Sequence, residues 1–168
     1  MIKLLLSDVD GVMTDGGVTF TSSAGGAAGG QTMTFSIRDG LGVKLWQGAG
    51  REFGIVTGRD TPMVAERAAA LGIELLYQGR FQKLPTVEQI AADRGLAMDE
   101  IAYVGDDLPD LPVIRAVGLG VAVADAVDEV QAAADHVLTT PGGYGAVREL
   151  IETILKDDGA WDAVLESF

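Results

Sequence analysis

Two aspartates separated by a single residue follow the first apolar run of the chain. Asp8 and Asp10 come directly after residues 2–7, and Gly11 follows the pair. One carboxylate of such a pair can attack an electrophilic centre while the other transfers a proton. Gly11 keeps the turn compact enough for close backbone approach. Taken singly, however, an aspartate after a strand is usually a helix cap or a turn residue.

Further polar side chains follow three later apolar runs. Thr57 ends one run, Lys83 lies in the loop after the next, and Asp106 and Asp107 close a fourth. The carboxyl ends of parallel strands meet at one edge of a sheet, where α/β proteins bind their ligands. We therefore expect a carboxylate pair, a hydroxyl, an ammonium group and a second acidic cluster to converge, which separate surface or turn roles do not explain.

This combination of groups suits the hydrolysis of a phosphomonoester. The dianionic ester repels a carboxylate, so a cation must first neutralise it; Asp8, Asp106 and the backbone carbonyl of Asp10 could hold Mg²⁺. Thr57 can donate a hydrogen bond to the phosphoryl oxygens, and Lys83 supplies positive charge. Asp8 would then form an aspartyl-phosphate, with Asp10 as the acid and later the base.

Short apolar runs alternate with longer helical patterns along the chain. The runs predicted to be strands cover residues 2–7, 53–57, 75–78, 101–105, 118–123 and 136–138. A helix is expected from Thr61-Pro62 to Leu71-Gly72, because Thr caps and Pro favours the first turn. Similar helices are expected over 83–94, 128–134 and 145–156. The alternation predicts an α/β fold, a three-layer Rossmann-like parallel sheet.

One stretch breaks this alternation. Residues 17–21 and 32–36 are β-prone and enclose a tip, 22–31, that is rich in glycine, alanine and serine. Two such pieces around a turn-rich tip predict a β-hairpin flap over about 16–36. The tip is too short and too local to be a domain linker, so residues 1–168 are predicted to form a single domain.

Composition excludes several classes of function. The chain has 168 residues, a formal net charge of −13, no cysteine and one histidine, His136. The negative charge argues against a nucleic-acid partner. Thiolate and histidine-rich metal sites are excluded, which leaves oxygen ligands and ions such as Mg²⁺. With neither a signal peptide nor an apolar run long enough to cross a bilayer, a soluble cytoplasmic protein without membrane partners is expected.

The polar residues also resemble the four ordered motifs of the haloacid dehalogenase superfamily. The resemblance rests on Asp-Val-Asp-Gly-Val-Met-Thr at 8–14, Thr57, Lys83 and Gly-Asp-Asp-Leu-Pro-Asp at 105–110. It implies that Asp8, Asp106 and the Asp10 carbonyl bind Mg²⁺, with Asp107 and Asp110 as outer support or an alternative ligand. Signalling receiver domains combine similar groups, but in them an acidic pair follows the first strand and the phosphorylated aspartate comes later. In this chain the Asp-x-Asp pair of Asp8 and Asp10 comes first and the adjacent pair of Asp106 and Asp107 comes last. The order here favours the enzyme over a non-catalytic phospho-switch or interaction module.

Large caps in this superfamily are inserted between the first and second motifs or between the second and third. From Asp10 to Thr57 there is room for the flap and one helix, and from Thr57 to Lys83 for a helix and a strand. No cap domain is therefore expected. Because an open site lacks the water exclusion that a lid supplies, a neighbouring subunit is expected to complete it.

Over nearly the whole length the chain is similar to the family of 3-deoxy-D-manno-octulosonate 8-phosphate phosphatases. The similarity rests on residues 35–42, 57–59, 76–79, 102–107, 121–126 and 142–149. It implies a homotetramer whose flaps form a central barrel, a phosphorylated sugar acid as substrate, and a role in lipopolysaccharide-precursor synthesis. By position it implies substrate contacts, shared across subunits, for Asp10, Ser36, Ile37, Arg38, Asp39, Gly40, Lys44, Gly58, Arg59, Arg67 and Lys83.

Three alternatives stay open at this point. The substrate could be a nine-carbon sugar-acid 9-phosphate or a wider range of sugar phosphates, although Arg59 just after Thr57-Gly58 favours the eight-carbon acid. Arg67 could instead be an exposed helix residue paired with Glu66 or Glu74. The C-terminal segment with Trp161, Leu165 and Phe168 could pack on its own domain or reach a neighbour's active site.

Overall fold

The computed structural model describes residues 1–21 and 29–167; residues 22–28, the greater part of the predicted flap tip, and Phe168 lie outside the described residues. Its main sheet has six parallel strands in the order β5-β4-β1-β6-β7-β8. The strands are β1 (Leu4–Ser7), β4 (Glu52–Val56), β5 (Leu75–Tyr77), β6 (Ile101–Gly105), β7 (Leu119–Ala122) and β8 (His136–Val137). All six predicted strands are confirmed, and most are one or two residues shorter than expected.

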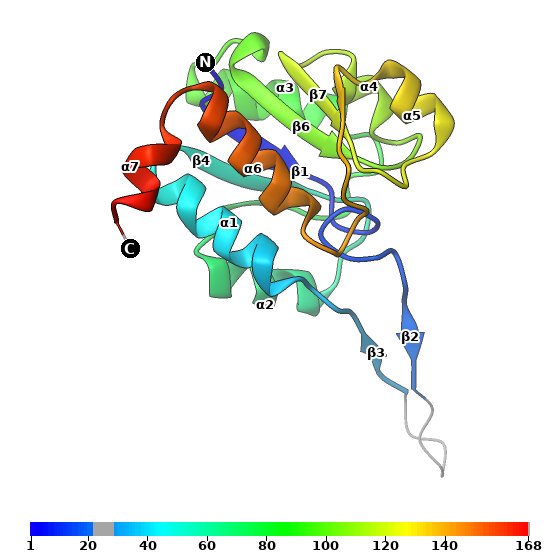
Figure 1. Ribbon diagram of the computed structural model, residues 1–168. Helices are drawn as coiled ribbons and strands as arrows, with labels where there is room; N and C mark the ends of the chain where they lie inside the picture. Colours follow the sequence, from blue (N-terminus) through cyan, green and yellow to red (C-terminus); the bar gives the residue numbers. More distant parts are fainter. Residues whose placement is uncertain (22–28, 168) are drawn as a thin grey trace.

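Helices cover both faces of the sheet, as Figure 1 shows. They are α1 (Ile37–Gly48), α2 (Pro62–Leu71), α3 (Leu84–Arg94), α4 (Leu111–Ile114), α5 (Asp128–Ala133), α6 (Ala146–Asp157) and α7 (Trp161–Leu165), with a 3₁₀ turn, η1 (Met98–Glu100). One layer contains α1, which packs against both α6 and α2, and the other contains α4, which packs against α3 and α5. The predicted three-layer α/β fold is confirmed.

Local sequence sets the ends of these helices. Thr61 precedes α2, and its Oγ1 accepts a hydrogen bond from Val64 N at 3.3 Å. Gly72 ends the same helix with a φ of +64°, which few residues other than glycine adopt readily. Helix α1 begins in the same way, because Ser36 Oγ accepts a hydrogen bond from Asp39 N. The predicted start and stop of α2 are confirmed.

The predicted hairpin is confirmed by two short antiparallel strands that project from the body of the molecule (Figure 1). In it, β2 (Thr19–Phe20) pairs with β3 (Gln31–Thr32). The second strand ends at Thr32, before the predicted boundary at Ser36, and Ser36 is the cap of α1. Between Asp10 and Thr57 the described residues form this hairpin, α1 and β4. Between Thr57 and Lys83 they form α2 and β5. Nothing in that part of the chain makes a cap domain.

A single apolar core lies on both faces of the sheet. The β1 strand lies at its centre, with Leu4, Leu5 and Leu6 fully buried. Both neighbours of β1 pair with it in register, Leu4 opposite Glu52 on β4 and opposite Ile101 on β6. The carboxyl ends of β1, β4 and β6 therefore lie level at one edge. No helix among the described residues is long and apolar enough to cross a membrane.

Candidate active site

A cavity of about 420 Å³ opens at the carboxyl edge of the central strands. Its lining consists of Asp8, Asp10, Gly11, Gly16, Gly58, Arg59, Phe81, Lys83, Asp106, Asp107, Pro109 and Asp110. These residues come from loops far apart in the sequence, as the parallel strands require. The structure therefore brings the predicted acidic pair, Lys83 and the second acidic cluster together.

Asp8 and Lys83 form a buried ion pair at the base of this cavity. Lys83 Nζ lies 2.9 Å from Asp8 Oδ1 and 2.6 Å from Asp110 Oδ1. Burial and, to a smaller extent, the charge of Asp110 raise the pKa of Asp8 to about 6, although Lys83 opposes both effects. Burial alone would lower the pKa of Lys83, but its two carboxylates outweigh burial and raise it. Lys83 is thus a permanent cation beside the expected nucleophile.

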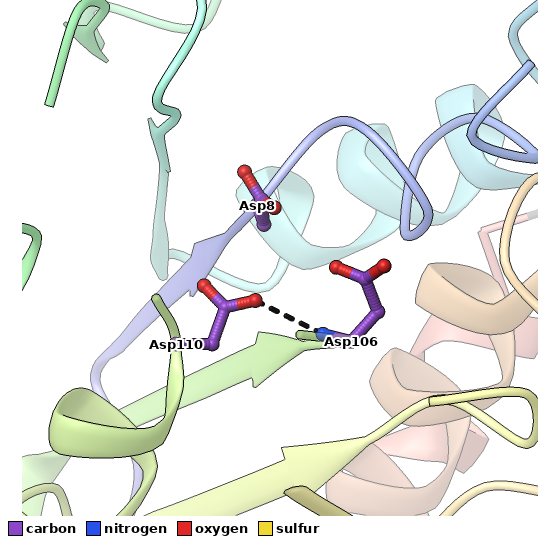
Figure 2. Close-up of side chains that lie close together, drawn as sticks. All are labelled: Asp8, Asp106 and Asp110. Atoms are coloured by element: carbon purple, nitrogen blue, oxygen red, sulfur yellow. Dashed lines mark hydrogen bonds between the residues drawn. The ribbon is translucent and has the colours of Figure 1, made fainter. Parts of the chain in front are cut away.

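Three carboxyl groups, Asp8, Asp106 and Asp110, face a common space (Figure 2). One oxygen of each lies within 4.8 Å of the others. Burial, together with repulsion from Asp8 and Asp110, raises the pKa of Asp106 to about 8. A buried acidic cluster with only oxygen donors is the kind of environment that Mg²⁺ prefers. The residues present therefore fit a Mg²⁺ ion.

Gly11 has no side chain and so leaves space for the Asp106 carboxylate of this cluster. Its φ of +83° lies in the region that favours glycine, and a Cβ atom there would lie 2.0 Å from Asp106 Oδ2. Any side chain at position 11 would displace the Asp106 carboxylate. The compact turn expected after the acidic pair is confirmed in this form.

Asp10 lies at the side of the cavity, where Arg59 connects it to the hairpin. Arg59 Nη1 lies 3.5 Å from Asp10 Oδ1, and Arg59 Nη2 donates a hydrogen bond to Gln31 Oε1 at 3.1 Å. Burial raises the pKa of Asp10, while Arg59 and Lys83 oppose the shift. A raised pKa favours the protonated form, which is the form that an acid needs to protonate a leaving group.

Thr57 and Asp107 are placed less directly. Thr57 is 1% exposed; its Oγ1 accepts a hydrogen bond from Arg59 N, and Gly58 next to it lines the cavity. Thr57 itself does not line the cavity, so a hydrogen bond from its hydroxyl to a phosphoryl oxygen stays a prediction. Asp107 lines the cavity from an exposed turn, where its Oδ1 accepts a hydrogen bond from Leu108 N.

The other predicted substrate residues, Ser36 to Gly40, Lys44 and Arg67, do not line this cavity. Arg67 Nη2 donates to the Ser36 carbonyl at 2.9 Å, and its guanidinium lies over the Phe35 ring. Lys44 Nζ donates to the Leu71 carbonyl at the end of α2, at 2.6 Å. The alternative pairing of Arg67 with Glu66 or Glu74 is wrong, because the arginine turns toward α1 instead.

Within that segment, Asp39 and Gly40 are buried, whereas Ile37 and Arg38 are exposed. Asp39 is 1% exposed, and its Oδ1 accepts a hydrogen bond from Arg148 N in the first turn of α6, at 2.8 Å. Gly145 precedes α6 and has no side chain that could cap the helix. The Asp39 carboxylate caps α6 instead. Arg38 lines a separate polar hollow with Tyr144 and Arg148. Substrate contacts from this segment stay a prediction.

Not every residue at the site was predicted, and Phe81 and Tyr103 are two examples. Phe81 lines the cavity with 73% of its surface exposed, and Tyr103 is fully buried beneath Asp110. An isolated phenylalanine in the loop of residues 79–82 gives no sequence signal for such a role. Tyr103 lies within the run that ends in Gly105 and the acidic cluster, but an aromatic residue in a buried strand is ordinarily core.

The C-terminal helix α7 packs on its own chain, against α6. Trp161 lies beside the Arg148 and Lys156 side chains, and Val164 is 9% exposed. Together with the end of α1, the helix borders an apolar hollow at the opposite end of α1 from Ser36. Within one chain α7 is therefore remote from the cavity, and an approach of the C-terminal segment to a neighbour's site stays a prediction.

Comparison with known proteins identifies the family of the chain. Residues 76–150 match the model of the haloacid dehalogenase-like hydrolase family. The 3-deoxy-D-manno-octulosonate 8-phosphate phosphatase of Haemophilus influenzae is 40% identical over 158 residues, which is 94% of this chain and 85% of that protein. The same enzyme from Escherichia coli K12 is 42% identical over 161 residues, covering 96% and 83%. The chain belongs to this family of haloacid dehalogenase-like phosphatases.

A solved structure of the family agrees over almost the entire chain. The Moraxella catarrhalis 3-deoxy-D-manno-octulosonate 8-phosphate phosphatase, in complex with magnesium ion, phosphate ion and a KDO molecule, superimposes with a TM-score of 0.94 at 38% identity. The match covers 99% of this chain and 93% of that one. The Haemophilus influenzae enzyme in a cobalt-bound form has a TM-score of 0.85 at 41% identity, covering 94% and 90%. Membership in the family thus rests on fold and sequence together.

Proposed function

We propose that this protein is a Mg²⁺-dependent phosphatase that hydrolyses 3-deoxy-D-manno-octulosonate 8-phosphate through an aspartyl-phosphate on Asp8. The observation that carries the proposal is the buried Asp8 carboxylate, held 2.9 Å from Lys83 at the base of a cavity that Asp10 also lines. The choice of substrate rests on the names of the relatives, which are called 3-deoxy-D-manno-octulosonate 8-phosphate phosphatases and match this chain over nearly its whole length.

Asp8 performs the first chemical step. One of its carboxylate oxygens attacks the phosphorus, the bond from phosphorus to the sugar oxygen breaks, and the phosphoryl group stays on Asp8. Lys83, whose Nζ lies 2.9 Å from Asp8 Oδ1 at the same cavity, balances the charge that spreads over the phosphoryl oxygens. The Thr57 hydroxyl supplies a hydrogen bond to those oxygens.

Asp10 moves the protons of both steps. In its protonated form it gives a proton to the alkoxide of the sugar as that group leaves. It then accepts a proton from the water that attacks the phosphorus of the aspartyl-phosphate, so that phosphate is released and Asp8 is restored. Arg59, 3.5 Å from Asp10, keeps the side chain at the cavity.

The Asp8 and Asp106 side chains and the Asp10 carbonyl would hold the Mg²⁺ ion. When bound, it neutralises the negative charge of the phosphate ester that would otherwise repel Asp8. Asp107 and Asp110 lie next to this set as supporting groups.

A homotetramer completes the proposal. The cavity of one chain is open, and Ser36 to Gly40, Lys44 and Arg67 lie away from it. A substrate with a phosphate at one end and a carboxylate at the other needs cations at both ends. Two chains in contact could bring the second set of groups to the first chain's cavity. Light scattering, which measures the molecular mass in solution, tests the homotetramer. A mass near that of one chain would reject it.

The deciding experiment for the activity is phosphate release with and without Mg²⁺ from a panel of substrates. The panel holds the eight-carbon and nine-carbon sugar-acid phosphates and several common sugar phosphates, with the Asp8→Asn variant as the control. We expect a preference in kcat/KM for the eight-carbon acid of about a hundredfold or more, because the substrate carboxylate is recognised as well as the phosphate.

The other outcomes separate the parts of the proposal. Equal rates across the panel, or a preference for the nine-carbon acid, would reject the substrate but keep the aspartyl-phosphate chemistry. Absence of any Mg²⁺-dependent release would favour the non-catalytic alternative. A cytoplasmic location and a role in lipopolysaccharide-precursor synthesis go with the eight-carbon substrate and stay predictions.

A further inference from the structure

The side chain of Tyr103 lies beneath the active-site cavity without lining it. Tyr103 is on β6, is 0% exposed, and its hydroxyl donates a hydrogen bond to Asp110 Oδ1 at 2.5 Å. A buried hydroxyl needs such a partner, because leaving it unpaired costs free energy. The partner in this case is an acidic residue of the site rather than a backbone carbonyl of the core.

The Asp110 carboxylate has a donor at each of its acceptor positions. Oδ1 accepts hydrogen bonds from the Tyr103 hydroxyl and from Lys83 Nζ, the latter at 2.6 Å. Oδ2 accepts hydrogen bonds from Asp106 N at 3.0 Å and from Asp107 N at 3.3 Å (Figure 2 draws the first of these). A carboxylate offers about four lone-pair sites, so these donors satisfy Asp110. Binding a cation would cost it at least one of them.

We propose that Tyr103 is a positioning residue that keeps Asp110 turned toward Lys83 and away from the metal-binding position. The inference rests on the proposed phosphatase function of the same site. Asp110 lies close enough to Asp8 and Asp106 to be a third metal ligand, and its two Oδ1 donors are what distinguish it from them. Asp8 and Asp106 are thereby left as the side-chain ligands, while Asp110 anchors the ammonium group.

The position of Lys83 links Tyr103 to the chemistry. Lys83 Nζ lies between Asp110 Oδ1 and Asp8 Oδ1, at 2.6 and 2.9 Å. If Asp110 turned away, Lys83 would lose one of its two anchors, and its distance from the attacking oxygen would no longer be fixed. Gly105 supports the same arrangement, since a Cβ there would lie 2.4 Å from Asp110 Cβ and push the carboxylate aside. The effect of Tyr103 is therefore expected in turnover more than in substrate binding.

The test compares Tyr103→Phe with Tyr77→Phe. Phenylalanine keeps the ring of Tyr103 and removes only the donor; Tyr77 is a half-buried tyrosine of β5 that does not line the cavity. With Mg²⁺ and the eight-carbon substrate, we expect kcat of Tyr103→Phe to fall about five- to tenfold with KM changed less than about twofold. Tyr77→Phe should match the wild type in both constants.

A second measurement reports on Lys83 without metal or substrate. In protein labelled with ¹⁵N-lysine, the ammonium group of the buried Lys83 should give a separate NMR signal, because it is shielded from water and held by two carboxylates. We expect that signal to shift or broaden in Tyr103→Phe and to stay in place in Tyr77→Phe. A purely packing role for Tyr103 predicts lower thermal stability with an unchanged Lys83 signal and unchanged kcat, and that result would overturn the proposal.

Restoring the donor gives a third test. Incorporation of 4-aminophenylalanine at position 103 replaces O–H by an N–H donor of similar reach, and it should recover most of the lost kcat. Failure of this rescue in a folded protein would also contradict the proposal. If the wild type hydrolysed none of the sugar-acid phosphates while the Lys83 signal still responded to Tyr103→Phe, the proposed function would fail and the positioning role would stand.

Discussion

Asp8 and Asp39 are both buried carboxylic acids, and burial raises the pKa of each to about 6. Their neighbours differ. Asp8 faces two further carboxylates and a lysine at an open cavity. Asp39 faces the backbone N–H groups of α6 and the guanidinium of Arg67, and it caps a helix. A raised pKa therefore identifies burial, and only the surrounding groups tell a reacting carboxylate from a structural one.

The largest expected effect separates the two aspartates directly. Asp8→Asn removes the nucleophile, so kcat should fall by at least about a thousandfold, whereas the melting temperature should stay within about 3 °C. Asp39→Asn is the matched control, with the same change of group and a similar burial, and it should lose less than about tenfold. Steady-state kinetics and thermal unfolding measure both. Full activity in Asp8→Asn would show that Asp8 is not the nucleophile and that it does not differ in role from Asp39.

The sequence predicted the Asp8 region well for a physical reason. Short apolar runs bounded by turn residues define buried parallel strands, and the carboxyl ends of such strands must meet, so Asp8, Lys83 and Asp106 could be brought together from order alone. The same argument does not reach the Asp39 region. Its partner Arg148 is 109 residues away, on a helix whose packing against α1 is set by the complete core.

The partners of single buried groups were beyond the sequence for the same reason. The motif predicted that Asp110 supports the site or binds the metal, but it could not show that Tyr103 and Lys83 share its Oδ1. Nor could it show that Arg67 turns to the Ser36 carbonyl, since that contact depends on how α2 lies against α1. Strand order fixes which residues share an edge, and side-chain packing decides what each of them contacts.

The next effect concerns the cation of the Asp8 region. Lys83→Met keeps the apolar stem and removes the charge from a side chain that is 3% exposed. We expect kcat to fall about a hundredfold, since the charge acts on the developing transition state. The metal-free variant should also lose about 3 kcal/mol of unfolding free energy, because Asp8 and Asp110 lose the cation that they share.

An exposed lysine gives the control for this loss. Lys156 pairs with Glu152 one turn away on α6, and its side chain is 51% exposed. Lys156→Met should change stability by less than about 0.5 kcal/mol and leave kcat unaltered. Chemical denaturation without Mg²⁺ and steady-state kinetics with it measure both variants. Equal losses of unfolding free energy and kcat in Lys83→Met and Lys156→Met would mean that burial of the ion pair between Lys83 and Asp8 matters neither for stability nor for turnover.

The smallest effect is the pH dependence of stability that Asp39 contributes. Its pKa is about 6 in the folded protein against an ordinary value of 3.8, so folding favours the protonated form. The contribution is fully present below about pH 4 and is lost as the pH rises to about 6, by about 3 kcal/mol in total. Relative to Asp39→Asn, the wild type should therefore lose stability over this range and stay level above it. The difference between two denaturation series, taken without metal from pH 4 to pH 7, isolates Asp39 from the other acids. A flat difference would show that the N–H groups of α6 offset the burial of this carboxylate, and the likeness between Asp39 and Asp8 would then be only one of exposure.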